Sequence, residues 1–165
     1  MPNTRESEFP TVYWADTEVR FLTYSEDPVV DADVNASLVF AFLGSRCVVA
    51  DIRERGWCIP SGRREIGETA EATAHREAWE EAGLMLGPLR RIGHYILRKP
   101  VDHESRLAAV FVCSVQTLDA LPPGSESRSV RLMTLRDMKQ NYYVWDALIE
   151  AVARYAFSVR PATTL

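Results

Sequence analysis

Four glutamates and an arginine stand at fixed spacing in the middle of the chain: Glu68, Arg76, Glu77, Glu80 and Glu81. On a helix, Glu77 shares one face with Glu80 and Glu81, three and four residues further on. Like charges at that spacing repel one another unless a cation neutralises them. Mg²⁺ suits such a cluster, because it is bound through a few carboxylates, water and substrate phosphates. On spacing alone, a cluster of three glutamates is more often a solvated acidic helix face, and a magnesium site is the alternative.

The helix that must carry these carboxylates is predicted over Ala70–Ala82, a segment rich in Ala and Glu and without Gly or Pro. Thr69 is its expected N-cap and Gly83 its left-handed C-terminal stop. Glu68 lies at the helix start, where the helix dipole favours an anion. Small residues recur at steps of four, which predicts a helix face lying close against a sheet: Ala70, Ala74, Ala78 and Ala82.

The order of these residues resembles the Nudix box, G-x5-E-x7-R-E-U-x-E-E-x-G-U, in which U is a bulky apolar residue. Between positions 62 and 84, every charged and glycine position agrees. Ala78 stands where the family often has a larger apolar residue, and Ser61 replaces the first of the usual glycine pair before the box. The stretch Trp-Cys-Ile-Pro-Ser-Gly at 57–62 looks like the Trp-x-x-Pro-Gly-Gly segment that commonly precedes the box.

The resemblance implies a metal site and a reaction. Mg²⁺, with Mn²⁺ as an alternative, is expected on Glu80 and Glu81 as principal ligands, with Glu68 as a supporting ligand and the Ser61 carbonyl as a further one. Glu77 is either a ligand or the base that takes a proton from water, and the choice of base stays open. Arg76 looks like the family arginine that orients the glutamates by charge-assisted hydrogen bonds. Catalysis is thereby assigned to Arg76, Glu77 and Glu80. The implied reaction is hydrolysis of a nucleoside diphosphate linked to another moiety.

Within the family, the order of elements and the segment Ile92-Gly93-His94-Tyr95 resemble enzymes that cleave nucleoside triphosphates. The resemblance is greatest to the Bacillus-type 8-oxo-dGTP diphosphatases. Pro100 instead points to ADP-ribose and nucleotide-sugar pyrophosphatases. A nucleotide-sensing Nudix module that does no chemistry is a further alternative, which the intact set of box glutamates disfavours. Removal of an RNA cap would need a basic groove, and the acidic composition of the chain does not indicate one.

Basic residues are candidates for contacts to the substrate phosphates: Arg63 and Arg64, and further along the chain Arg98, Lys99 and His103. Three aromatic residues are candidates for stacking on a nucleobase: Trp14, Phe40 and Tyr95. For the basic residues the alternative is a solvated surface charge, and for the aromatic ones a place in the core.

The composition fits a single domain over residues 1–165, with 47% hydrophobic and 25% charged residues. A net charge of −4 argues against polymeric nucleic acid as a partner but allows a small nucleotide carried with its own cation. Cys47, Cys58 and Cys113 match no metal or disulfide spacing, so buried free thiols are expected. No signal peptide or membrane span is visible, so we expect a cytoplasmic protein. Monomer and homodimer are both compatible with the sequence.

The resemblance implies the Nudix fold, an α/β/α sandwich with a mixed β-sheet, and the pattern of apolar residues agrees with this α/β class. Strands are expected at 11–14 and 19–24 as an opening hairpin, at 34–43 and 46–52 as a central hairpin, and at 89–97, 106–115 and 129–134. A helical turn is expected at 135–140, followed by an amphipathic helix over 145–155. Residues 1–10 are expected to be frayed, 86–88 to form a turn and 117–127 a long loop.

Overall fold

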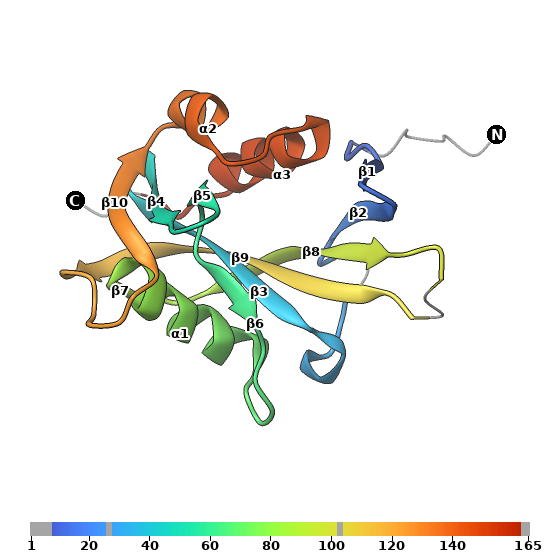
Figure 1. The fold of residues 1–165 in the computed structure, drawn as a ribbon, viewed down its shortest axis with the longest axis horizontal. Helices are drawn as coiled ribbons and strands as arrows, with labels where there is room; N and C mark the ends of the chain where they lie inside the picture. The colour runs from blue at the N-terminus through green and yellow to red at the C-terminus, as the bar shows by residue number, and fades with distance from the viewer. Residues whose placement is uncertain (1–7, 26–27, 102–103, 163–165) are drawn as a thin grey trace.

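The expected strands assemble into one mixed sheet in the computed structural model, which describes residues 8–25, 28–101 and 104–162 (Figure 1). The strand order is β1 (Val12–Trp14), β2 (Thr17–Thr23), β8 (Arg90–Arg98), β9 (Arg106–Leu118), β3 (Ala36–Leu43), β4 (Arg46–Ile52) and β10 (Ser127–Met133). Three short strands pair off this path: β5 (Gly56–Cys58) with β4, β6 (Ser61–Arg63) with β3, and β7 (Leu84–Leu86) with β9. A 3-10 turn, η1 (Asp31–Asp33), precedes β3. The parallel pairing of β3 with β9 among antiparallel pairs confirms the mixed sheet.

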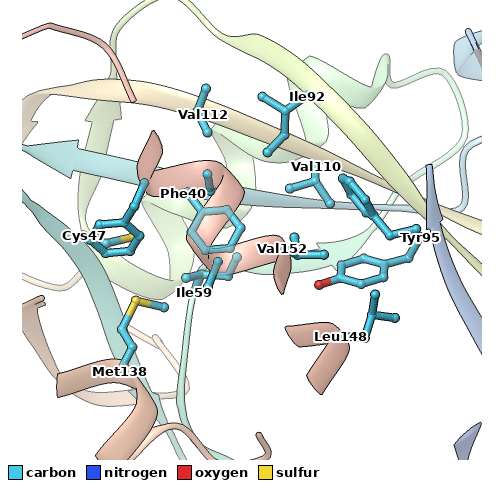
Figure 2. Close-up of a cluster of buried hydrophobic side chains, with 14 of the residues drawn as sticks. Phe40, Cys47, Ile59, Ile92, Tyr95, Val110, Val112, Met138, Leu148 and Val152 are labelled. Atoms are coloured by element: carbon cyan, nitrogen blue, oxygen red, sulfur yellow. The ribbon is translucent and has the colours of Figure 1, made fainter. Parts of the chain in front are cut away.

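Helices cover both faces of the sheet, with α1 (Ala70–Ala82) on one side and α2 (Leu135–Asn141) and α3 (Ala147–Ser158) on the other (Figure 1). Side chains of β3 alternate between the two sides. Val39 and Ala41 join the apolar cluster under α1, whereas Phe40 and Phe42 join the cluster under α3. Figure 2 shows Phe40 among the side chains of that second cluster. The architecture is therefore the expected α/β/α sandwich.

Local signals fix α1 as predicted. The Thr69 hydroxyl accepts a hydrogen bond from the Ala72 amide at 3.0 Å, and Gly83 ends the helix at φ 67°. The four residues of the alanine row are all buried against the sheet. Ser37 of β3 is also buried, and its hydroxyl donates to the Ala70 carbonyl at 2.8 Å. These contacts attach the start of α1 to the middle of the sheet.

Several expectations for the chain need correction. Phe9, expected in a frayed segment, is buried against Phe21 and Tyr155, with ring centroids 4.8 and 5.7 Å apart. Residues 1–7 and His103 lie outside the described residues. The turn expected at 86–88 follows a strand, β7, whose Leu84 pairs with Leu118, so β9 is longer and the next loop shorter than expected.

The central hairpin of β3 and β4 forms, but its strands pair only next to the turn, at Phe42–Cys47 and Leu43–Arg46. Further from the turn, β6 takes the place of β4 beside β3. The three cysteines are buried free thiols, as predicted. Within the described residues, no helix is long and apolar enough to cross a membrane.

Candidate active site

Arg76 of α1 gathers three of the box glutamates around its guanidinium group. Its Nε and Nη2 donate to the two carboxylate oxygens of Glu68 at 2.8 and 2.9 Å. Its Nη1 donates to Glu77 at 2.8 Å and to Glu80 at 3.3 Å. Nη2 also donates to the carbonyl of Arg63 in β6 at 2.9 Å. The arginine thus ties the helix, the loop before it and strand β6 into one unit.

Glu68 is held as an anion by several donors at once. Besides Arg76, the Glu65 amide donates to its Oε1 at 2.8 Å and the Thr73 hydroxyl at 3.1 Å. The hydrogen bonds from Arg76 and then the one from the Glu65 amide lower the pKa of Glu68 to about 2. Its contacts fix the loop that leads into α1, and its role as a supporting metal ligand stays a prediction.

Glu81 occupies the most enclosed place in the cluster. The Ser61 amide donates to its Oε1 at 3.4 Å, and its Oε2 is buried without a hydrogen-bond donor among the described residues. Burial, and next the negative charge of Glu77, raise the pKa of Glu81 to about 8. Burial also raises the pKa of Glu77, against the opposing effect of Arg76. A cation at this place would relieve both effects by supplying the missing positive charge.

The first glycine of the box leaves room for the side chain of Glu77. A Cβ atom on Gly62 would run into the carboxyl group of Glu77, so a larger residue there would displace that carboxyl group. Ser61, the departure from the family pattern, lies one residue earlier in β6 and pairs with Leu38 of β3. An extended strand accepts serine without strain, so the departure leaves the approach of β6 to α1 intact.

The donor types of the cluster suit Mg²⁺, which prefers carboxylate and carbonyl oxygens. The Oε2 of Glu81 is buried without a hydrogen-bond partner among the described residues, so it is a suitable oxygen ligand for a cation. Within the described residues, however, no three acidic, histidine or cysteine side chains converge closely enough to hold an ion as they stand. In this arrangement the carboxylates of Glu68, Glu77 and Glu80 are paired with Arg76. Glu80 has a long contact of 3.3 Å and a side chain that is 53% exposed, so it is the carboxylate with most freedom to turn.

The two arginines after Gly62 differ in their surroundings. Arg63 is exposed on β6. Arg64 donates to the carbonyls of Val34 at 2.7 Å, Glu68 at 3.1 Å and Ala32 at 3.3 Å, which ties the box loop to the segment before β3. A contact of either arginine with substrate phosphates stays a prediction, and Arg63 is the more accessible of the two.

A cleft of about 610 Å³ opens beside the carboxylates of α1. Its lining comes from the helix and from the loop between β9 and β10: Glu77, Trp79, Glu80, Glu81, Pro122, Pro123, Gly124, Ser125 and Glu126. The loop is fastened to the end of α1, since the hydroxyls of Ser125 and Ser127 donate to the carbonyls of Glu80 and Glu81 at 2.7 and 2.5 Å. No sequence pattern indicates this wall, because only the fold brings the loop back to the helix.

An apolar pocket of about 130 Å³ lies on the α3 side of the sheet. It brings together the three aromatic residues proposed for base stacking: Trp14, Phe40 and Tyr95. Ile59, Tyr142 and Tyr143 also line it, and the Ile59 amide donates to the Tyr142 hydroxyl at 3.1 Å. Figure 2 shows Phe40, Ile59 and Tyr95 in this region. The two tyrosines were not foreseen, although the run Tyr-Tyr-Val-Trp at 142–145 is an aromatic signal in the sequence.

Known structures share this arrangement of sheet and helices. The pyrophosphohydrolase BsRppH of Bacillus subtilis superposes with a TM-score of 0.70 at 17% identity, covering 89% of this chain and 96% of that one. A NUDIX hydrolase from Nitrosomonas europaea gives 0.59 at 16% identity, covering 77% and 91%. A MutT structure from work on the Aliivibrio salmonicida and Vibrio cholerae proteins gives 0.53 at 18% identity, covering 76% and 97%. At these identities the likeness shows the fold.

The family follows from the sequence itself, because the model of the NUDIX domain matches residues 34–154. The chain belongs to the Nudix family. Its activity is that of a hydrolase of the pyrophosphohydrolase kind.

Proposed function

We propose that the chain hydrolyses a nucleoside or deoxynucleoside triphosphate to the monophosphate and pyrophosphate, with Mg²⁺ as cofactor and Mn²⁺ as an alternative. Oxidised nucleotides such as 8-oxo-dGTP are included among the proposed substrates. The observation that carries the proposal is the group of three box carboxylates held by Arg76, with Glu81 beside them and its Oε2 buried without a hydrogen-bond partner among the described residues. A module that only senses nucleotides would have no need of this costly cluster of negative charge.

The metal would be held by Glu77, Glu80 and Glu81, supported by Glu68 and the Ser61 carbonyl. When bound, it supplies positive charge that neutralises phosphate oxygens and lowers the pKa of a water molecule. Glu77 is one candidate for the base that takes the proton of the attacking water. The oxygen of that water joins one phosphorus, and the bridging oxygen leaves with the other phosphate. Arg76 acts by holding the glutamates in position, which fixes the geometry on which the rate depends.

The aromatic pocket supports a nucleotide as the substrate. Trp14, Phe40 and Tyr95 put aromatic rings in its largely apolar lining, which suits a planar base. Ile59 lines this pocket, and two residues further on the Ser61 amide contacts Glu81. Two residues of extended chain span about 7 Å, so a base in the pocket leaves its phosphates near the carboxylates. The proposed substrate is a small nucleotide in the cytoplasm. The proposed enzyme is a monomer or a homodimer.

One observation favours a second candidate, a nucleotide with a group other than phosphate beyond the scissile bond. The cleft beside Glu80 and Glu81 has room for such a group, as ADP-ribose or a nucleotide sugar would present. Pro100, which pointed to these substrates, lies in an exposed turn after β8 and outside the lining of both cavities.

A panel of normal and 8-oxo dNTPs, nucleoside diphosphates, ADP-ribose and nucleotide sugars tests the proposal, with Mg²⁺ or Mn²⁺ and with Glu80→Gln as the blank. Pyrophosphate and a monophosphate released from a dNTP is the expected result. Turnover of ADP-ribose alone would replace the first candidate by the second. Absence of any glutamate-dependent turnover would move the chain to the sensing class.

A further inference from the structure

The chain changes its pairing partner between β5 and β6 (Figure 1). The pairing of β5 with β4 ends at Cys58, and the pairing of β6 with β3 begins at Ser61. Ile59 and Pro60 lie between the two ladders. The Pro60 carbonyl accepts a hydrogen bond from the Val39 amide at 3.0 Å, but proline itself has no amide to donate. The amide of Ile59 is therefore the donor for which this crossing has to provide an acceptor.

That acceptor is the hydroxyl of Tyr142, 83 residues further along the chain, at 3.1 Å from the Ile59 nitrogen. Ile59 is buried, with 2% of its surface exposed, and a buried amide needs a hydrogen-bond partner. The tyrosine hydroxyl thus takes the place of a ladder hydrogen bond at the point where the chain passes from β4 to β3.

The backbone around Tyr142 is itself held on two sides. Its amide donates to the Met138 carbonyl at the end of α2 at 2.8 Å, and the Tyr143 amide donates to the Trp57 carbonyl of β5 at 2.9 Å. A Cβ atom on Gly56 would lie 3.1 Å from the Cβ of Tyr143, so the two segments are in close contact. The hydroxyl is therefore presented from a fixed position.

The segment that Tyr142 holds leads directly to the carboxylates. Two residues after Ile59, the Ser61 amide donates to Glu81 at 3.4 Å, and the Ser61 carbonyl is one of the proposed metal ligands. Tyr142 also lines the aromatic pocket proposed for the base. One side chain thus contacts both the place proposed for the base and the segment that approaches the metal site.

We propose that Tyr142 is a positioning residue for hydrolysis, with its hydroxyl fixing residues 59–61 beside Glu81 and its ring forming a wall for the base. The inference rests on the proposed pyrophosphohydrolase function and deepens it. The hydroxyl and the ring have separate effects: the hydroxyl governs the metal site and the rate, and the ring governs the affinity for the nucleotide.

Amide hydrogen exchange, followed by NMR in the metal-free protein, tests the role of the hydroxyl without substrate. In wild type, the Ile59 amide should exchange as slowly as the Val39 amide. Tyr142→Phe should speed exchange at Ile59 and Ser61 at least tenfold and leave the amides in the middle of α1 unchanged. Tyr13→Phe, at a position of β1 that is 65% exposed, is the matched control and should exchange like wild type.

Mn²⁺ binding and kinetics test the consequence for the site. Calorimetry should show Mn²⁺ binding about tenfold weaker in Tyr142→Phe than in wild type or Tyr13→Phe, the effect of loosening a segment that supports metal ligands. Tyr142→Phe should lower kcat for the best dNTP about tenfold with KM within twofold of wild type. Tyr142→Ala, which loses the ring as well, should in addition raise KM at least fivefold.

The outcomes separate this inference from the proposed function. An Ile59 amide that exchanges without protection in wild type overturns the role of Tyr142, and that measurement decides even if Tyr142→Phe does not fold. Equal exchange, or equal kcat, in wild type and Tyr142→Phe also overturns it. If exchange and Mn²⁺ binding change as expected but wild type hydrolyses no nucleotide, the proposed function fails while the positioning of residues 59–61 by Tyr142 is supported.

Discussion

The guanidinium of Arg76 holds the carboxylate of Glu68 through two parallel hydrogen bonds, from Nε at 2.8 Å and from Nη2 at 2.9 Å. Such a two-pronged pair fixes the orientation of both planar groups, which a point charge cannot do. Because the guanidinium is fixed, its third nitrogen stays directed at Glu77, 2.8 Å away. The loop carboxylate therefore sets the position of a helix carboxylate through the arginine between them.

Arg76→Lys should lower kcat about 10- to 100-fold, the usual effect of losing a residue that orients metal ligands. The charge remains but the fork does not, so Glu68 and Glu77 lose their common alignment. Hydrolysis of the best substrate at saturating Mg²⁺ measures the effect. Arg136→Lys, at an exposed position on α2, is the matched control and should retain full activity. A wild-type rate in Arg76→Lys would contradict this role of the arginine.

Gly62→Ala should cost activity about 100-fold, because the added Cβ would displace the Glu77 carboxyl group. Gly44→Ala serves as the comparison. That glycine has a φ of 63° and open space around its Cβ position, so alanine there should cost about 1 kcal/mol of stability and leave the rate alone. Kinetics and urea unfolding of both variants separate the effects. Full activity in Gly62→Ala would show that the position of Glu77 does not govern the rate.

The metal-free protein should lose stability as pH rises from about 4.5 to about 8. Glu81 has a pKa near 8 in the folded state against 4.5 for the ordinary group, so between these values the folded state binds a proton that the unfolded state has released. Its favourable contribution is complete below pH 4.5 and is lost as pH passes 8. Glu81→Gln cannot ionise, so in EDTA at pH 8 it should melt on the order of 5 °C above the wild type, with little difference at pH 4.5.

Melting curves in EDTA across that pH range measure the effect, with Glu71→Gln, an exposed residue of the same helix, as the control. Parallel curves for wild type and Glu81→Gln would be inconsistent with a carboxyl group whose charged form is destabilised by burial at this position.

The part of the fold that local chemistry decides could be predicted from the sequence. The bounds of α1, its Thr69 cap and its Gly83 stop follow from neighbouring residues alone, and the structure confirms each. The long apolar run of β3 was equally clear. The box motif named the residues of the carboxylate cluster in advance. The structure shows Arg76 in contact with three of them, Glu68, Glu77 and Glu80, and its orienting role stays a prediction.

The remainder depends on contacts between distant segments. Strands β5, β6 and β7 are three residues long and form only because β4, β3 and β9 are there to pair with them. Phe9 packs against Phe21 of β2 and Tyr155 of α3, and no local sequence pattern predicts these contacts. The cleft beside Trp79 likewise forms only because a loop more than 40 residues further along the chain supplies its other wall.

We propose that the box carboxylates hold a divalent cation which hydrolysis requires. The most direct test is the rate of pyrophosphate release from a dNTP as Mg²⁺ is titrated, in wild type, Glu80→Gln, Glu81→Gln and the control Glu71→Gln. We predict saturable activation by Mg²⁺ in wild type and the control, and a rate at least 100-fold lower in the other two variants at every Mg²⁺ concentration. Hydrolysis that proceeds in EDTA, or that survives both substitutions unchanged, would show that these carboxylates hold no cation needed for the reaction.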